Sequence, residues 1–165
     1  MAVTAHAALG SLIGHTNGVT KRYAVANGAT VYVNEFVYLD AAGRVTSASI
    51  AGVRLLGQVV AADTENMDRA YADNAVGNAG GTVKVLVNID PEERYLLKND
   101  NVGTTFAVAH QGQYFDLVGN PGSQLVDTST VTTSGQLVCL EFNPGIRGTD
   151  ATYGIFKIAE RQLEL

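Results

Sequence analysis

Three segments of the chain decide its fold: Gln113-Tyr-Phe-Asp-Leu-Val118, Gln136-Leu-Val-Cys-Leu-Glu-Phe142 and Tyr153-Gly-Ile-Phe-Lys-Ile158. Each is six or seven residues long and rich in β-branched and aromatic residues. Runs of this length, separated by segments of Asn, Pro, Gly, Ser and Thr, are typical of β-strands joined by turns. We therefore expect the C-terminal third of the chain to form an antiparallel β-structure.

Further strand patterns lie at residues 19–25, 30–39, 53–61, 82–89, 94–97 and 124–131. The clearest alternation is at residues 82–89, where four aliphatic side chains fall on one face. Asp90-Pro91 ends that strand, because proline cannot donate a hydrogen bond to a β-ladder. The patterns together predict an all-β fold, an antiparallel sandwich or barrel (jelly-roll-like), with an extended N-terminal arm and at most one or two short helices.

Local signals refine this prediction at three places. Asn27-Gly28 indicates a two-residue hairpin turn, because both residue types tolerate positive φ. Gly57 is a possible β-bulge inside its strand. Residues 63–78 are compatible with a short helix or with an ordered loop.

Residues 30–39 form a strand pattern that is apolar on both faces. Val31, Val33, Val37 and Leu39 fall on one face, and Tyr32, Phe36 and Tyr38 fall on the other. Such a strand needs cover on both sides, from the interior of the protein or from a neighbouring subunit. Tyr32, Phe36 and Tyr38 are therefore candidates for a subunit interface, and packing in the core is the alternative.

The first 18 residues differ from the rest, which we expect to form a single β domain over residues 19–165. Residues 1–18 are rich in Ala and Gly and look like an arm. Leu9, Leu12 and Ile13 are its larger apolar residues and are candidates for contact with a capsid or a neighbouring subunit. A frayed terminus is the alternative.

The composition excludes several functional classes. The net charge is −5, from 11 basic and 16 acidic residues, and no basic run offers phosphate contacts to a nucleic acid. Charged residues make up 16% of the chain, which leaves few groups to solvate its surface and suggests burial against partners. We expect no secretory signal and no membrane span, so the chain should fold in a cytoplasm. Cys139 is the single cysteine, which precludes an internal disulfide.

No arrangement of reactive residues indicates an enzyme, a metal site or a cofactor site. His6, His15 and His110 lack the spacing of a zinc site. The nearest acidic group, Asp90, Glu92 and Glu93, flanks Pro91 and predicts a solvated turn. No nucleophile elbow or phosphate-binding loop occurs, and the chain lacks the tryptophan that sugar-binding surfaces often use.

Two blocks of the sequence resemble known phage proteins. The first contains Ala29-Thr-Val-Tyr-Val-Asn-Glu-Phe-Val-Tyr-Leu-Asp-Ala-Ala-Gly-Arg-Val-Thr46 and Leu55-Leu-Gly-Gln-Val-Val60. It resembles the pattern GD-x-V-Y-L-D-x-x-G-x-V … G-V-V of small capsid cement proteins from tailed bacteriophages, with Asn34-Glu35 in place of Gly-Asp. The second block contains the three C-terminal segments quoted above and Gln124-Leu-Val-Asp-Thr-Ser129. It is similar to the C-terminal half of phage head decoration and structural proteins.

The resemblance implies a non-enzymatic virion protein without a cofactor. Decoration proteins of this kind bind the major capsid protein on the outer surface of the expanded head, commonly as homotrimers, and stabilise it against the pressure of packaged DNA. Two alternatives stay open at this point. One is a tail, neck or fibre-associated β module of a phage particle, and the other is a small β-barrel enzyme or a module that binds a small ligand or a glycan.

Overall fold

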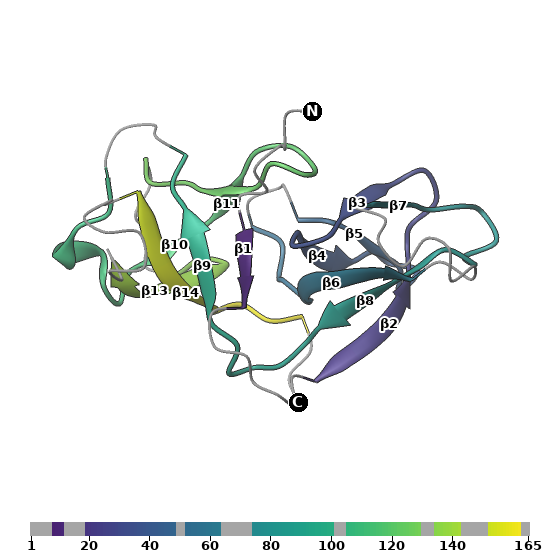
Figure 1. Ribbon diagram of the computed structural model, residues 1–165, viewed down its shortest axis with the longest axis horizontal. Helices are drawn as coiled ribbons and strands as arrows, with labels where there is room; N and C mark the ends of the chain where they lie inside the picture. Colours follow the sequence, from purple (N-terminus) through teal and green to yellow (C-terminus); the bar gives the residue numbers. More distant parts are fainter. Residues whose placement is uncertain are drawn as a thin grey trace.

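The computed structural model describes residues 8–11, 19–48, 52–63, 74–100, 105–129, 134–142 and 152–162 of the chain. These residues form fourteen β-strands and one 3-10 turn, with no α-helix among them. All pairs between these strands are antiparallel. The predicted all-β antiparallel class is therefore confirmed. Figure 1 shows the strands gathered in two lobes that lie side by side.

The N-terminal lobe contains a five-stranded sheet in the order β2-β8-β6-β4-β5 and a two-stranded ribbon, β3 with β7. Its strands are β2 (Thr20–Ala24), β3 (Thr30–Tyr32), β4 (Phe36–Leu39), β5 (Val45–Ser47), β6 (Gly57–Asp63), β7 (Asn74–Val76) and β8 (Lys84–Asn88). Small and branched aliphatic side chains from the sheet and the ribbon pack together. This N-lobe core consists of Tyr23, Val25, Val31, Val37, Val45, Leu56, Val59, Ala62, Ala75, Val85, Val87 and Ile89.

The C-terminal lobe contains a five-stranded sheet in the order β1-β9-β14-β13-β10 and a second ribbon, β11 with β12. Its strands are β1 (Ala8–Ser11), β9 (Tyr95–Lys98), β10 (Tyr114–Phe115), β11 (Leu117–Val118), β12 (Leu125–Val126), β13 (Leu137–Phe142) and β14 (Tyr153–Ile158). The 3-10 turn at Val108–His110 precedes β10. Of the strand predicted at residues 124–131, Leu125 and Val126 pair with β11, and residues 127–129 do not continue the strand. Residues 130 and 131 lie outside the described parts.

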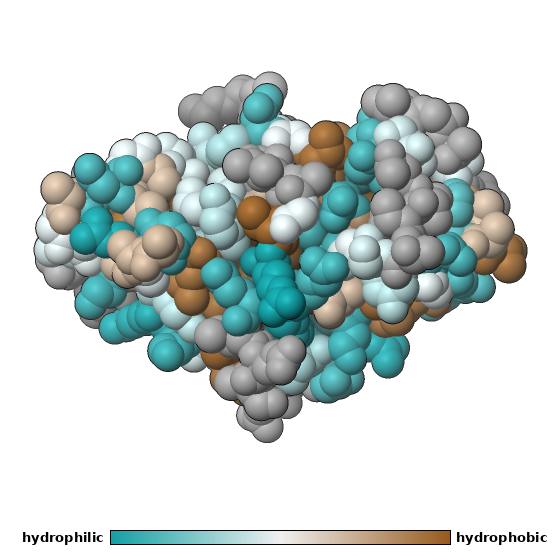
Figure 2. Space-filling view, turned by 180° about the vertical axis from the view of Figure 1, so that it is seen from behind, coloured by the Kyte–Doolittle hydropathy of each residue, from teal (hydrophilic) through white to brown (hydrophobic). Residues whose placement is uncertain are grey.

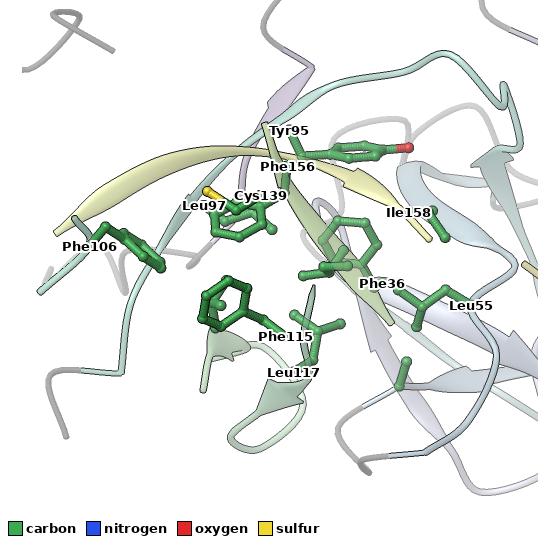
Figure 3. Close-up of a cluster of buried hydrophobic side chains, with 13 residues drawn as sticks. Phe36, Leu55, Tyr95, Leu97, Phe106, Phe115, Leu117, Cys139, Phe156 and Ile158 are labelled. Atoms are coloured by element: carbon green, nitrogen blue, oxygen red, sulfur yellow. The ribbon is translucent and has the colours of Figure 1, made fainter. Parts of the chain in front are cut away.

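The C-lobe core contains several aromatic side chains (Figure 3). The N-lobe core is mostly aliphatic, with Tyr23 as its aromatic member. It consists of Phe36, Ala48, Leu55, Tyr95, Leu97, Phe106, Phe115, Leu117, Val126, Leu137, Cys139, Phe156 and Ile158. The Phe115 ring meets those of Phe106 and Phe156 edge to face, at centroid distances of 6.0 and 5.9 Å. Burying each such ring stabilises the fold by roughly 1.5–3 kcal/mol.

Strand β4 belongs to both cores, because its side chains alternate between the two lobes. Phe36 lies in the C-lobe core, and Val37 lies in the N-lobe core. Tyr38 packs against the C-lobe core and Leu39 against the N-lobe core. For β4, the prediction of cover on both faces is therefore confirmed, and both covers come from cores of the same chain. The run of residues 30–39 is not one continuous strand, however, because a turn between Tyr32 and Phe36 separates β3 from β4.

Two local predictions in the N-terminal lobe were wrong. The Asn27-Gly28 turn does not close a hairpin, because β2 pairs with β8 while β3 pairs with β7. The bulge of β6 lies at Val60, between the pairs Val59–Val87 and Ala61–Leu86, and not at Gly57. Gly57 serves a different purpose, since a Cβ there would collide with the backbone carbonyl of Asn88. Within residues 63–78, residues 74–76 form β7, and residues 64–73 lie outside the described parts.

Candidate functional site

The N-terminal contact candidates are only partly within the described residues. Leu9 lies in β1, which pairs with the edge of β9 through Ala8–Leu97 and Ser11–Tyr95. Leu12 and Ile13 lie outside the described residues. Part of the arm therefore adds a strand to the C-terminal sheet. Contact of Leu9, Leu12 and Ile13 with a capsid or a neighbouring subunit stays a prediction.

The three aromatic candidates occupy different environments. Phe36 has no exposed surface and meets Tyr95 edge to face, with ring centroids 4.8 Å apart. Tyr38 is half-buried and packs against the C-lobe core. Tyr32 is also half-buried and lies beneath the turn at Gly122, where a Cβ would come within 3.1 Å of the tyrosine ring. Phe36 thus packs in the core, while a subunit interface at Tyr32 and Tyr38 stays a prediction.

A buried carboxylate organises the turn between β3 and β4. Asn34 has a φ of 68°, the one positive φ of a non-glycine residue among those the structure describes. Glu35 follows it and is only 3% exposed. Its Oε2 accepts a hydrogen bond from Tyr32 N at 2.9 Å, and its Oε1 accepts from the Ser47 hydroxyl and from Gly122 N at 3.3 Å. Because Gly122 belongs to the C-terminal half of the chain, Glu35 also fixes one lobe to the other.

Glutamine side chains from the C-terminal lobe pair with the backbone of β4. The Gln124 amide accepts from Phe36 N at 2.7 Å and donates to Phe36 O at 2.9 Å. The Gln162 amide does the same at Leu39, accepting from its N at 2.5 Å and donating to its O at 2.8 Å. Each carboxamide therefore pairs with both backbone groups of one β4 residue, as a neighbouring strand would. Leaving these groups unpaired in the interior would be costly.

Two more residues tie the end of β14 and the start of β13 to other segments. The amide of Gln136, which has no exposed surface, accepts from Leu117 N and donates to Val53 O, both at 2.8 Å. The Arg161 guanidinium donates to Ile89 O at 3.2 Å and to Asp90 O at 2.7 Å, where the chain crosses between the lobes. Glu35, Gln124, Gln136, Arg161 and Gln162 together form what we call the lobe seam.

The acidic turn after β8 is less solvated than its sequence predicts. Glu92 is exposed and forms an ion pair with Lys157 at 2.9 Å, which holds the pKa of Glu92 below its usual value. Glu93, in contrast, is 1% exposed and accepts a hydrogen bond from Asn88 Nδ2 at 2.9 Å. The expectation of a fully solvated turn was therefore wrong for Glu93, because its carboxylate is buried and hydrogen-bonded to Asn88.

Buried titratable groups in the C-lobe core are held in their neutral forms. Burial, and next the charge of Glu93, raise the pKa of the Tyr95 hydroxyl well above its ordinary value. Burial also raises the pKa of the Cys139 thiol to about 11, although its sulfur lies 3.7 Å from Glu141 O. A nucleophilic cysteine needs a depressed pKa and access to substrate. Cys139 has neither, so its chemistry is that of a small core residue.

Within the ranges that the structure describes, no group of three or more His, Cys, Asp or Glu residues could hold a metal ion. The same parts of the chain contain no helix with the length and apolar character needed to cross a bilayer. His110 accepts a hydrogen bond from Ala107 N at 3.1 Å and packs edge-on against Phe115.

The residues of the lobe seam were missed at the level of sequence. Each of the three seam glutamines is followed by a leucine, and this local sequence has no signal that distinguishes a buried amide from an exposed one. Gln124 and Phe36 are 88 positions apart, and Gln162 and Leu39 are 123 apart, so only the folded topology brings them together. The side chains of the seam form hydrogen bonds with backbone groups of the other lobe, which joins the two lobes into one mechanical unit.

On the face shown in Figure 2, hydrophobic residues appear as separate patches among hydrophilic ones. The exposed large apolar side chains in the described residues are Val19, Val60, Val76, Val108, Val118 and Leu140. No protein family model matches the chain, and no curated protein or solved structure shows significant similarity to it.

Proposed function

We propose that the protein is a non-enzymatic structural protein of a tailed-phage virion that binds the outer surface of the expanded capsid and stabilises it against internal DNA pressure. The observation that carries the proposal is the geometry of Asn34 and Glu35. These two residues are where the chain departs from the Gly-Asp of the cement-protein pattern, and both substitutes suit the local conformation.

The backbone at Asn34 favours glycine, because its φ of 68° lies in the left-handed region. Asparagine is among the few other residues that adopt this region readily. At the next position an acidic side chain can accept the turn N–H, and Glu35 accepts Tyr32 N at 2.9 Å. The departure from the pattern therefore preserves the chemistry of the turn and supports the resemblance.

The remainder of the pattern also coincides with a structural unit. Asp40 Oδ1 accepts hydrogen bonds from Ala42 N and Arg44 N, both at 2.9 Å, and Gly43 has a φ of 72°. These residues form the tight turn that joins β4 to β5. The D-x-x-G element of the pattern is thus the hairpin turn of the strand shared by both cores.

The mechanism that we propose is thermodynamic linkage. A ligand that binds the assembled lattice but not separate subunits stabilises the lattice by mass action. We infer that the protein acts as a homotrimer, so that several weak contacts add through their effective concentration. The excess of acidic residues suits a place on the outside of the head, away from DNA.

Co-sedimentation with capsids tests the proposal. Purified protein would be incubated with expanded heads of the encoding phage from which the protein has been removed, and with unexpanded proheads as the control. We expect saturable binding to expanded heads only, and stripped heads should lose DNA at lower temperature than heads with the protein restored. Absence of binding to either particle would refute the proposal. Labelling of intact virions at one vertex only would favour a tail, neck or fibre module.

A further inference from the structure

The Asn27-Gly28 step forms a tight turn between β2 and β3. Ala29 N donates to Ala26 O at 3.0 Å, which closes a β-turn with Asn27 and Gly28 at its centre. Gly28 has a φ of 74°, whereas Asn27 is not among the residues with a positive φ. A positive φ at the third residue alone defines a type II turn, in which the second residue has a ψ of about +120°. The turn is therefore of type II and not of the hairpin type that the sequence suggests.

An asparagine followed by glycine is chemically prone to deamidation. The glycine N attacks the asparagine Cγ and forms a five-membered succinimide, while the bond from Cγ to the amide nitrogen breaks. That nitrogen leaves as ammonia, and the proton of the glycine N–H reaches it through solvent. Water then opens the ring at either carbonyl, which yields aspartate or isoaspartate. Glycine favours the attack because it has no Cβ and a flexible backbone. Asn27 and Gly28 are both exposed, so water has access to the site.

Two features of the folded turn oppose this attack. Gly28 N donates to Gly77 O at 3.1 Å, so the nucleophilic nitrogen would have to give up a hydrogen bond. Ring closure also needs Gly28 N on the same side of the Cα–C bond as Asn27 Cβ. That arrangement has a ψ of about −120°, as in the mirror-image type II′ turn. The type II turn holds the nitrogen about 120° away from it.

Neighbouring segments keep the turn in this conformation. Ala26 N donates to Val45 O at 2.8 Å, and Gly77 N donates to Ala29 O at 2.8 Å. Gly77 packs so closely against the turn that a Cβ at this position would lie 1.9 Å from Ala26 O. The hydrogen bonds that Gly77 makes with the turn therefore depend on its having no side chain.

We propose that Asn27 is a conformationally gated deamidation site: the folded turn suppresses succinimide formation, and opening of the turn permits it. The reaction rate then follows the population of molecules in which this part of the structure has opened. Isoaspartate adds one carbon atom to the backbone between Asn27 and Gly28, so the product cannot restore the same turn. Deamidation would thus make a transient opening between β2 and β3 permanent, and it would add one negative charge.

A comparison of the full chain in native buffer and in denaturing urea tests the proposal. Both samples would be incubated at the same mildly alkaline pH and temperature. Trypsin places Asn27 and the second Asn-Gly step, Asn17-Gly18, in different peptides. Mass spectrometry of these peptides measures the conversion of amide to acid, and fragmentation assigns the modified residue.

In urea we expect Asn17 and Asn27 to react at similar rates, because each precedes a glycine. In native buffer Asn27 should react at least about tenfold more slowly than in urea, because only molecules with an opened turn can react.

Gly77→Ala should release the suppression in the folded protein. The new Cβ must move away from Ala26 O, which separates Gly77 O from Gly28 N. Deamidation of Asn27 in native buffer should then accelerate about threefold or more. Gly80→Ala is the matched control, because a Cβ there would meet its nearest neighbour, Thr82 Cγ2, at 3.7 Å. Circular dichroism would verify that both variants are folded.

Deamidation of Asn27 as fast in native buffer as in urea would overturn the inference. Equal native rates in folded Gly77→Ala and Gly80→Ala would also overturn it, and so would an Asn27 that stays unmodified in urea while Asn17 reacts. The comparison between buffer and urea uses the parent protein alone, so the inference stays testable if Gly77→Ala does not fold. No phage head is present in these experiments, so their result is independent of the proposed function.

Discussion

Replacing Gln124 with methionine should lower the free energy of unfolding by about 2 kcal/mol. The Gln124 side chain is 4% exposed and forms two hydrogen bonds with the backbone of Phe36. Methionine has a similar length but cannot accept from Phe36 N or donate to Phe36 O. The carbonyl keeps its hydrogen bond from Ala48 N at 2.9 Å, so the main loss is at the buried N–H. Leaving such a group unpaired costs about 1–3 kcal/mol.

Thermal and urea unfolding would measure this effect at a fixed protein concentration. For a chain of this size, 1 kcal/mol corresponds to about 2–4 °C in Tm, so the variant should melt about 4–8 °C lower. Gln113→Met is the matched control, because Gln113 is exposed and its replacement should change Tm little.

The form of the transition is as informative as its midpoint. Because Phe36 and Val37 belong to different cores, we expect both lobes to unfold in one transition that shifts as a whole. A decrease in Tm no larger than that of Gln113→Met would refute the role given to the Gln124 amide. Two separate transitions, with only one shifted, would refute the claim that β4 couples the lobes.

Substitutions at three further positions test other parts of the structure. In urea unfolding, the free energy of unfolding of Asn34→Gly should stay within about 1 kcal/mol of that of the parent protein. Asn34→Val should lower it by about 1–2 kcal/mol or more, because a β-branched residue is strained at a φ of 68°. Tyr95→Phe should leave the unfolding free energy unchanged or raise it by about 1 kcal/mol, because the buried hydroxyl has no hydrogen-bond partner among the described residues; a clear loss would show that the hydroxyl is bonded. Cys139 should resist thiol reagents in the native protein near pH 8, because its pKa is raised to about 11. As the pH rises, the thiol ionises in the unfolded chain before it ionises in the folded protein. The stability that the folded thiol contributes is therefore present below pH 9 and is lost as the pH rises towards 11. Cys139→Ala should remove this part of the decrease in unfolding free energy at alkaline pH.

The faces of the strands could be predicted from the sequence, because side-chain alternation is a local property. Val85 and Val87 point into the N-lobe core, as the pattern at residues 82–89 indicates. The apolar character of both faces at residues 30–39 also proved informative, since β4 contributes to two cores. Periodicity does not specify the partner strand, however. The Asn27-Gly28 turn therefore suggested a hairpin, although β2 and β3 join different sheets.

The candidate sites depend on contacts between distant parts of the chain, which is why sequence reasoning reached them only in part. The amides of Gln124 and Gln162 become strand mimics only once the C-terminal lobe lies against β4. Phe36, Tyr32 and Tyr38 share one face of a pattern, but the turn at Asn34 gives each a different environment.

The lobe seam bears directly on the proposed function. A clamp gains from several simultaneous contacts only when its parts are held at a fixed spacing, because flexibility lowers the effective concentration of the second contact. Here Glu35 and Gln124 join the lobes at one end of β4, and Gln162 joins them at the other, at Leu39. Arg161 adds a fourth connection where the chain crosses between the lobes. A contact made by one lobe would therefore orient the other, so that a substitution such as Gln124→Met would weaken a two-lobed attachment without removing any residue from the binding surface.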